Sequence, residues 1–279
     1  MVTPGPRLAA PMHYAKEIAH FLNNFSFEGP VPSLKHMTAI AHYFSRLPYE
    51  NVSKIIKRAH EPGKALFRLP DELVYDHDTW HAGGTCFSLT YLLMGIYNFF
   101  DYVAEPLVCH LNWGQNNHSA LRVYHSGKAY LVDPGYMIYK PLPLHNQPVK
   151  SILSADTGIS LRYGKEEDLY SLYTFRKNEY VRRYTFKNQA VSLELFSNYW
   201  LDSFHLPGMN ELTLTRVSGY EMLFIQGDFI KRTSPVLVEK RREQILVDKL
   251  IQEQFHIPIE KIEEARHILA LSRKEDAGS

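Results

Sequence analysis

Cys86 has the surroundings that best suit a reactive residue in this sequence. It follows Gly83, Gly84 and Thr85, and an apolar run from Phe87 to Phe100 comes directly after it. Threonine often precedes a helix, so we predict a buried helix over this run, capped by Thr85, with Cys86 in its first turn. Unpaired N–H groups and the positive end of the helix dipole favour a thiolate there, and the thiolate is the reactive form of cysteine. A buried structural cysteine is the alternative interpretation.

A cysteine nucleophile needs a base and a third group that orients the base. His118 and Asp133 are the candidates, because they flank a predicted β-hairpin whose strands end at Tyr124 and resume at Ala129. If Ser126-Gly127 is a two-residue turn, paired positions sum to 253, and Asp133 becomes a diagonal neighbour of His118 at about 7–8 Å on one face. A three-residue turn would place the two on opposite faces. Ordinary strand-end and turn roles remain open for both residues.

The elements that must hold these residues are helical in the first part of the chain. Apolar residues at helical spacing between Tyr14 and Phe44 predict two amphipathic helices, broken at Gly29-Pro30 and restarted by Pro32-Ser33. Pro70, followed by acidic residues, predicts the start of another helix that stops at Gly83-Gly84. The predicted helix after Cys86 completes a helical first third.

The rest of the chain changes in periodicity. From about Tyr102, short runs rich in β-branched and aromatic residues predict a strand-rich middle third. The last part predicts strands over 211–217 and 222–225, then a charged helix from about 238 to 254 and a polar tail from Arg273. We therefore expect a mixed α/β third part.

Composition argues against several classes of protein. The 279 residues are 45% hydrophobic and 22% charged, which suits a globular chain of two or three domains. The net charge is +1, so we expect no binding to nucleic acid or to anionic membranes. The run from Phe87 to Phe100 is shorter than the roughly 20 apolar residues of a membrane span. Two cysteines, Cys86 and Cys109, form no disulfide framework and no leader-like start is evident, so we expect a cytoplasmic protein with reduced thiols.

The order of these segments resembles the arylamine N-acetyltransferase family. Leu47 to Val52, Leu-Pro-Tyr-Glu-Asn-Val, is similar to the family's Pro-Phe-Glu-Asn-Leu segment, and Gly83 to Phe87 matches its Gly-Gly-x-Cys element. His118 and the run from Leu131 to Tyr136 match the family's histidine and its Val-Asp-x-Gly-Phe element. The likeness begins at His20 and covers most of the chain.

The resemblance implies an α+β multidomain fold with a cysteine-protease-like core. A helical N-terminal domain, residues 1–101, would carry the nucleophile. A β-barrel middle domain, residues 102–205, would carry the histidine and the aspartate, and an α/β C-terminal lid would span residues 206–279. The periodicity described above agrees with this division.

The resemblance also implies a catalytic triad of Cys86, His118 and Asp133. The implied reaction is a two-step, ping-pong transfer of acetyl from acetyl-CoA to an arylamine, or to a related amine or hydrazine, through a thioester on the cysteine. Acetyl-CoA is then a co-substrate, a small-molecule amine is the partner, and no metal is expected.

Contacts to the substrates are less well marked. By resemblance, Tyr136 matches an aromatic residue of the acceptor pocket, and Phe87 is a weaker candidate for the same wall; both could equally be core residues. The sequence has neither a P-loop nor a dinucleotide fingerprint. The polar loop from Gly114 to Asn117, directly before His118, is therefore the nearest candidate contact for CoA.

Some positions depart from the family pattern, in which arginine, glutamate and asparagine stand where this chain has Ala82, Ser88 and Thr90. If the missing arginine normally pairs with the glutamate that matches Glu50, then Glu50 needs another partner here, since a buried unpaired carboxylate is costly. Arg46 and His81 are the candidates that we name from the sequence.

Three alternatives remain open at this point. The same triad is used by amide synthases and thiol hydrolases acting on other acyl donors. Ala82 and Ser88 would also suit a non-catalytic relative with the same fold. His77 and His81, four residues apart on a predicted helix, have the spacing of zinc ligands, although no third ligand is evident.

Overall fold

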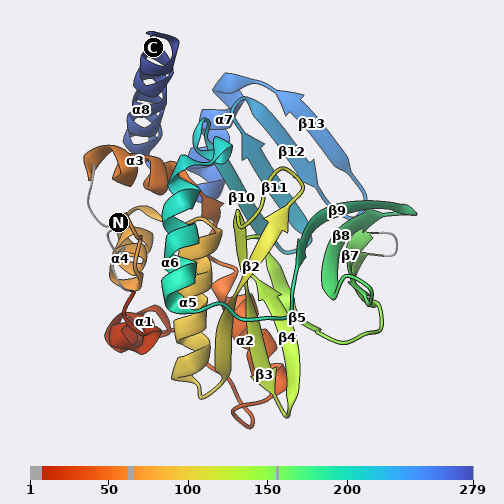
Figure 1. The fold of residues 1–279 in the computed structure, drawn as a ribbon. Coiled ribbons are helices and arrows are strands. Elements are labelled where there is room, and N and C mark those ends of the chain that lie inside the picture. Colours follow the sequence, from red (N-terminus) through yellow and green to blue (C-terminus); the bar gives the residue numbers. More distant parts are fainter. Residues whose placement is uncertain (1–7, 62–65, 155–156, 279) are drawn as a thin grey trace.

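The computed structural model describes residues 8–61, 66–154 and 157–278. Figure 1 shows a helical layer beside an eight-stranded sheet, with a second sheet of five strands next to both. Within the described residues, no helix has the length and apolar character needed to cross a membrane. The helical elements are η1 (Pro11–Tyr14), α1 (Ala15–Phe21), α2 (Leu34–Phe44), α3 (Val52–His60), α4 (Pro70–Trp80), α5 (Cys86–Phe99), α6 (Leu193–Asp202), η2 (Ser203–His205), η3 (Pro207–Met209), α7 (Gln244–Leu250), η4 (Ile251–Phe255) and α8 (Ile259–Gly278).

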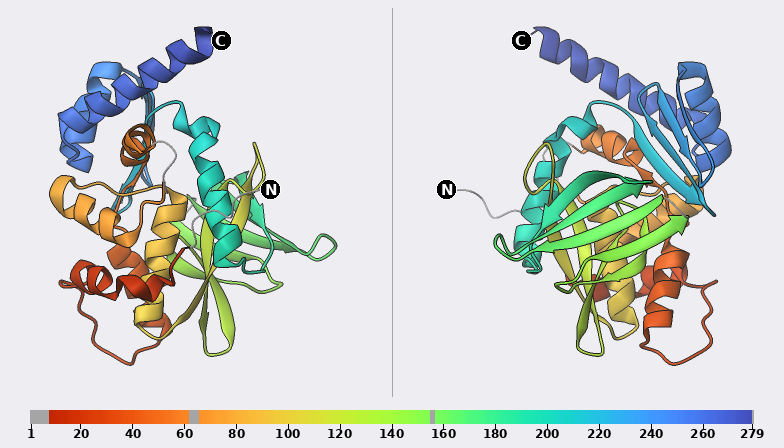
Figure 2. Two further views of the ribbon diagram at one scale, coloured as in Figure 1. Left: turned by 60° about the vertical axis from the view of Figure 1, so that its left-hand side comes forward. Right: turned by 90° about the vertical axis from the view of Figure 1, so that its right-hand side faces the viewer.

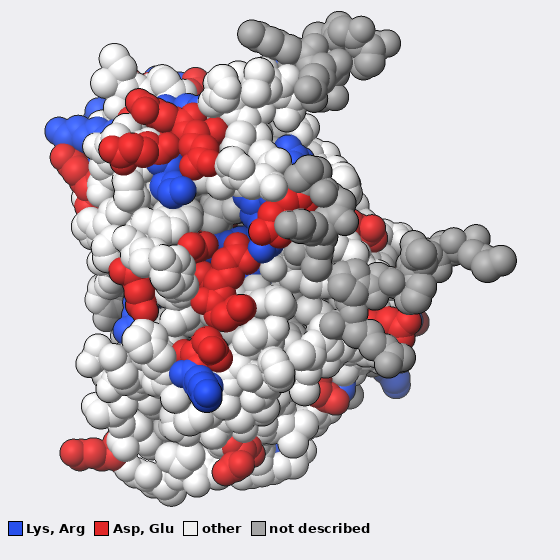
Figure 3. All heavy atoms as spheres, turned by 90° about the vertical axis from the view of Figure 1, so that its left-hand side faces the viewer, with Lys and Arg blue, Asp and Glu red and all other residues white. Residues whose placement is uncertain are grey.

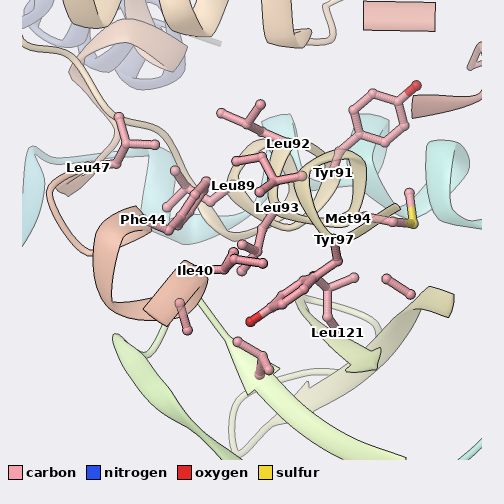
Figure 4. Packing of buried hydrophobic residues seen from close by; sticks show 14 of the residues in the cluster. Ile40, Phe44, Leu47, Leu89, Tyr91, Leu92, Leu93, Met94, Tyr97 and Leu121 are labelled. Carbon is pink, nitrogen blue, oxygen red and sulfur yellow. The ribbon is translucent and has the colours of Figure 1, made fainter. Parts of the chain in front are cut away.

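The helix after Cys86 forms as predicted, and α5 is the centre of the helical layer. Every residue from Cys86 to Tyr97 is buried. An apolar helix without a polar face must be covered on all sides, and α1, α2 and α4 together with two strands of the eight-stranded sheet do this. Figure 4 shows its leucines and Tyr97 packed against Ile40, Phe44 and Leu121. The nucleophile candidate therefore starts a rigid element.

The eight-stranded sheet is antiparallel and nearly closed into a barrel. Its strand order is β5-β4-β3-β2-β9-β8-β7-β6, so the two edge strands are neighbours in the chain and approach one another. The strands are β2 (Val103–Leu111), β3 (His118–His125), β4 (Lys128–Asp133), β5 (Ile138–Pro143), β6 (Val149–Ser154), β7 (Thr157–Gly164), β8 (Leu169–Arg176) and β9 (Glu179–Phe186). The strand-rich middle third is confirmed.

The β3–β4 hairpin has the two-residue turn. Leu121 pairs with Val132 and His125 with Lys128, so paired positions sum to 253. Ser126 and Gly127 both have positive φ, 50° and 71°, which is the geometry that matches the twist of a hairpin. The register prediction is confirmed, and it brings the two ends of the hairpin together on one face.

The five-stranded sheet links both ends of the chain. β1 (Tyr49–Glu50) pairs with β10 (Thr213–Ser218), and the order continues through β11 (Glu221–Gln226), β12 (Phe229–Thr233) and β13 (Val238–Arg242). Helices α7 and α8 pack on this sheet, as Figure 2 shows, and α3 shares their apolar core. A strand from the helical region thus belongs to the C-terminal sheet.

The structure corrects three details. The charged helix predicted from 238 is wrong at its start, because 238–242 pairs with β12 as an edge strand and the helix begins at Gln244. The predicted tail from Arg273 lies inside α8. Helix α4 ends at Trp80, before the two glycines, because His81 adopts a left-handed conformation with φ of 59°. The predicted fold class is confirmed, while the domain boundaries stay a prediction.

Candidate active site

Cys86 is the first residue of α5 and is 7% exposed. Thr85 occupies the capping position, but its side chain makes no capping bond, so that part of the prediction is wrong. The nearby Ser88 hydroxyl donates to the backbone carbonyl of Thr85 at 3.0 Å. A Cβ atom on Gly83 would lie 1.8 Å from the carbonyl oxygen of Pro48, so the glycine allows β1 to approach the loop that carries the cysteine.

His118 and Asp133 form a buried hydrogen-bonded pair. His118 Nε2 donates to Asp133 Oδ2 at 2.8 Å, and the Asp133 side chain has no exposed surface. The hydroxyl of Tyr184 donates to the same oxygen at 2.6 Å, and the backbone N–H of Tyr136 donates to Oδ1 at 3.0 Å. These bonds hold the carboxylate in one orientation. Sequence reasoning missed Tyr184, because it lies on β9, 51 residues after Asp133, with no local motif around it.

The third member of the set lies against the histidine. Cys86 and His118 share a side-chain hydrogen bond, and because Nε2 binds Asp133, Nδ1 is the ring atom available to the sulfur. A Cβ on Gly135 would lie 2.8 Å from both Cys86 Cβ and His118 Cε1, so this glycine lets the two side chains meet. The structure therefore brings all three predicted residues together.

Electrostatics favour a charged pair. Burial raises the pKa of the Cys86 thiol, but the hydrogen bond and charge of His118, the charge of Lys54 and a bond with the Ser119 backbone bring the pKa below its ordinary value. Burial lowers the pKa of His118, but Asp133 and Cys86 outweigh this and raise the pKa above its ordinary value. The opposite directions favour a thiolate beside an imidazolium.

The two aromatic candidates are placed differently. The Tyr136 ring is half-buried and lies 5.1 Å from the His118 ring, nearly perpendicular to it. Phe87 has no exposed surface, and its ring lies 5.3 Å from Phe196 in the core between α5 and α6. The structure therefore places Tyr136 at the site and gives Phe87 the surroundings of a core residue.

The loop before His118 is partly buried and holds an unused donor. Asn117 Oδ1 accepts the backbone N–H of Leu111 at 2.8 Å, and the Gly114 N–H donates to the Leu111 carbonyl at 3.1 Å. Asn117 Nδ2 is buried and has no hydrogen-bond partner in the described part of the chain. A Cβ on Gly114 would lie 2.9 Å from that nitrogen, so the glycine leaves room around it.

Arg68 is the partner of Glu50, which corrects the two candidates named from the sequence. Arg68 Nη1 lies 3.6 Å from Glu50 Oε1 and donates to the Gly83 carbonyl at 2.7 Å, and Nη2 donates to Asp76 at 2.6 Å. Ser53 supplies two further hydrogen bonds to the Glu50 carboxylate. An arginine from another position thus supplies the charge absent at position 82.

The rejected candidates have other contacts. The Arg46 guanidinium lies 4.2 Å from the ring centres of Phe21 and Tyr43, and the His81 ring lies 5.6 Å from that of His256. The sequence could not reveal Arg68 as this partner, because Arg68 precedes α4 and meets Glu50 only when the chain folds.

The predicted metal-binding alternative gains no support. His81 lies beyond the end of α4, its ring is 6.3 Å from that of His77, and His77 Nδ1 lies 3.1 Å from the Ala82 carbonyl. Among the residues with described positions, no group of three His, Cys, Asp or Glu side chains could hold a metal ion.

Figure 3 shows the face that carries α1, α3 and α4. Asp and Glu side chains gather across it, with Lys and Arg beside them. Ion pairs on these elements include Lys57 with Glu72 and His20 with Asp78. The described residues of this face form no continuous basic surface of the kind that nucleic acids bind.

Comparison with known proteins identifies the family and the fold of this chain. A family model described as N-acetyltransferase matches residues 33–263. An arylamine N-acetyltransferase from M. tuberculosis is 19% identical with a TM-score of 0.73, covering 89% of this chain and 95% of that one. One from M. smegmatis is 21% identical with a TM-score of 0.72, covering 90% and 96%.

A third solved structure, the Mycobacterium marinum arylamine N-acetyltransferase in complex with CoA, is 18% identical with a TM-score of 0.70, covering 90% of this chain and 96% of that one. A search of curated proteins found no match. The family match spans most of the chain, and the structural matches span nearly the whole of their own chains. The predicted resemblance is confirmed: the chain belongs to the N-acetyltransferase family of enzymes, and its fold is that of the arylamine N-acetyltransferases.

Proposed function

We propose that this protein moves an acetyl group from acetyl-CoA to an arylamine, or to a related amine or hydrazine, through a thioester on Cys86. The observation that carries the proposal is the arrangement of Cys86, His118 and Asp133, in which a cysteine at a helix start meets a histidine held by a buried carboxylate. This is the constellation that nucleophilic acyl transfer requires.

In the first step, the Cys86 thiolate attacks the thioester carbonyl. The new bond joins the acyl carbon to Cys86 Sγ, the bond from that carbon to the CoA sulfur breaks, and His118 gives its proton to the departing sulfur. In the second step, the amine nitrogen attacks the acyl-cysteine and His118 takes a proton from it. The bond to Sγ breaks, and the thiolate and the imidazolium are restored.

Asp133 keeps the imidazole oriented and stabilises its charged form, as the aspartate of a triad does. The tetrahedral intermediate needs donors for its oxyanion. Backbone N–H groups in the first turn of α5 have no partner within the helix, and we assign them this role. The Cys86 sulfur and these N–H groups lie on the same helical turn. The sulfur can therefore attack a carbonyl carbon while the N–H groups donate to the oxygen of the same carbonyl.

The donor and acceptor contacts extend the proposal. The structural relative in complex with CoA supports CoA as the leaving group. We assign Asn117 Nδ2, the unpaired buried donor beside His118, to an amide carbonyl of the pantetheine arm, with Gly114 leaving room for it. Tyr136 forms an aromatic wall of the acceptor pocket, whereas Phe87 has no exposed surface to offer. A cytoplasmic location stays a prediction.

The test is an acyl-adduct measurement by intact mass. The purified protein is mixed with acetyl-CoA, and we expect one added acetyl group that disappears on adding an arylamine and never forms in Cys86→Ala. A panel of other thioesters is run in parallel. Adducts with those thioesters but not with acetyl-CoA would replace this proposal with an amide synthase or hydrolase, and no adduct with any donor would indicate a non-catalytic relative.

A further inference from the structure

Lys54, in the first turn of α3, is a buried lysine that the reaction above does not use. It is only 4% exposed. Its ammonium group donates to the backbone carbonyl of Ser203 at 2.9 Å and to the hydroxyl of Ser203 at 2.6 Å. It also lies 4.3 Å from the centre of the Phe204 ring. Lysine is almost never buried to this degree without a charge partner.

The buried carboxylates of the candidate site are engaged elsewhere. Glu50 pairs with Arg68, and Asp133 pairs with His118. Within the described ranges of the chain, no Asp or Glu forms an ion pair with Lys54. Burial lowers the pKa of Lys54 to about 7. The positive charge of Arg58 also lowers this pKa, whereas the negative charge of Cys86 raises it. A buried cation held only by neutral oxygens and a ring is costly, which points to a use for its charge.

The chain segments that lead into Lys54 and into Cys86 are paired with one another. The Glu50 N–H donates to the Gly84 carbonyl at 3.0 Å, and Tyr49 forms a bridge with Gly84. Lys54 comes four residues after Glu50, and Cys86 comes two residues after Gly84. Phe204, which covers the ammonium group, belongs to the same buried cluster as Cys86. The electrostatic effect is mutual, since the ammonium lowers the pKa of Cys86 and the thiolate raises the pKa of Lys54.

We propose that Lys54 is a second cation of the active site, so that the Cys86 thiolate is stabilised from one side by the His118 imidazolium and from another by the Lys54 ammonium. The inference rests on the proposed function, in which Cys86 is the nucleophile. Lys54 acts through Cys86, so it is a positioning residue. Ser203 holds the ammonium on neutral oxygens, which leaves its charge to act on the thiolate.

Three further ionisable groups act on Cys86 among the described residues, and none of them supplies a positive charge. They are Tyr49, Tyr136 and Cys109, and burial raises the pKa of each, so all three are neutral at pH 7. Arg58 faces Lys54 from the same helix and donates to the Phe204 carbonyl. His118 and Lys54 are the cations whose charges lower the pKa of the Cys86 thiol.

The test is the pH dependence of Cys86 alkylation by iodoacetamide, followed by peptide mass. We compare the full-length protein with Lys54→Met, which keeps the length of the side chain and removes the charge, and with Lys54→Arg, which keeps the charge. Lys54→Met removes the positive charge that favours the thiolate, so the alkylation midpoint should rise by roughly one pH unit. Lys54→Arg keeps the charge and should keep the low midpoint. The wild-type curve is the reference, and circular dichroism at each pH shows whether each variant is folded.

Lys57→Met is the matched control, because Lys57 lies on the same helix but pairs with Glu72. Its midpoint should equal that of the wild type. A folded Lys54→Met variant with an unchanged midpoint would overturn this inference alone, leaving the proposed function intact. A wild-type midpoint at the ordinary thiol value of about 8.5 would overturn both, because no stabilised thiolate would then exist.

Discussion

The guanidinium group of Arg68 lies 3.6 Å from the carboxylate of Glu50, with both side chains inside the protein. Arg68 also donates to Asp76 of α4 and to the Gly83 carbonyl, so it connects these two segments to Glu50 of β1. Strand β1 lies beside the loop that carries Cys86, since Tyr49 pairs with Gly84. Ala82 stands where the resemblance places an arginine, and in this chain Glu50 is paired with Arg68, from a different part of the sequence. The same arginine thus holds both Glu50 and the loop of Gly83.

Arg68→Met should cost about 3–5 kcal/mol of unfolding free energy, because it leaves the buried Glu50 carboxylate unpaired. Urea denaturation measures this loss. The control is Arg242→Met, which removes an exposed ion pair with Asp228 and should cost about 1 kcal/mol or less. Equal losses in the two variants would contradict the buried role of Arg68.

Gly135→Ala should abolish the contact between Cys86 and His118, since the new methyl group would lie 2.8 Å from an atom of each. We expect acyl-adduct formation to slow by about 100-fold, as a displacement of around 1 Å can cause, and the unfolding free energy to fall by about 1–3 kcal/mol, because both side chains are buried. Gly208→Ala is the control, because no atom lies within 4 Å of the added carbon there. A Gly135→Ala protein that acylates at the wild-type rate would show that the two side chains need not meet.

Tyr184→Phe should destabilise the protein by about 2 kcal/mol, because the Asp133 carboxylate loses a buried hydrogen bond. Acylation should slow as well, since the carboxylate is then held less firmly. Thermal and urea unfolding measure the first effect and adduct kinetics the second. Tyr163→Phe removes a matching bond to Asp168 at the surface, and we expect no measurable change from it. If both variants behave alike, Tyr184 has no special part in the site.

His118→Ala should shift the alkylation of Cys86 to alkaline pH. With His118 present, the pKa of Cys86 lies below its ordinary value, so the thiolate persists as pH falls and is lost only when pH drops through that lowered pKa. Without His118, burial dominates and raises the pKa of the thiol, and alkylation at pH 7 should slow sharply. The wild type should still react below pH 7, more readily than an ordinary thiol does.

The control for this pH profile is His125→Ala, at the end of the β3–β4 hairpin, which should match the wild type. An ordinary thiol profile in the wild type, or no change in His118→Ala, would argue against the ion pair. Rates of iodoacetamide labelling across the pH range decide between these outcomes.

Local patterns in the sequence predicted the framework of the site. The apolar run after Cys86 forms the predicted buried helix, and Ser126-Gly127 forms the two-residue turn, one of the two turn lengths that the sequence allowed, which sets the register of the hairpin. Ser33 caps α2 by accepting the His36 N–H, as the restart signal indicated. These features depend on neighbours within a few residues, so periodicity and turn chemistry reveal them.

Other features depend on contacts between distant segments. The edge strand at 238–242 was mistaken for a helix, because its charged residues become a strand only by pairing with β12. Tyr184 reaches Asp133 from β9, and Arg68 reaches Glu50 from the residues before α4. No short-range pattern carries that information.

The sequence by itself determined the family, the three residues of the proposed triad and the hairpin that carries two of them, while the structure chose the turn length that puts these two on one face. Only the tertiary structure decided which charges surround them. The energy of a buried charge depends on what solvates and pairs it in three dimensions. Lys54 therefore belongs to no motif in the sequence, whereas in the folded protein it is a buried cation whose charge acts on the thiol.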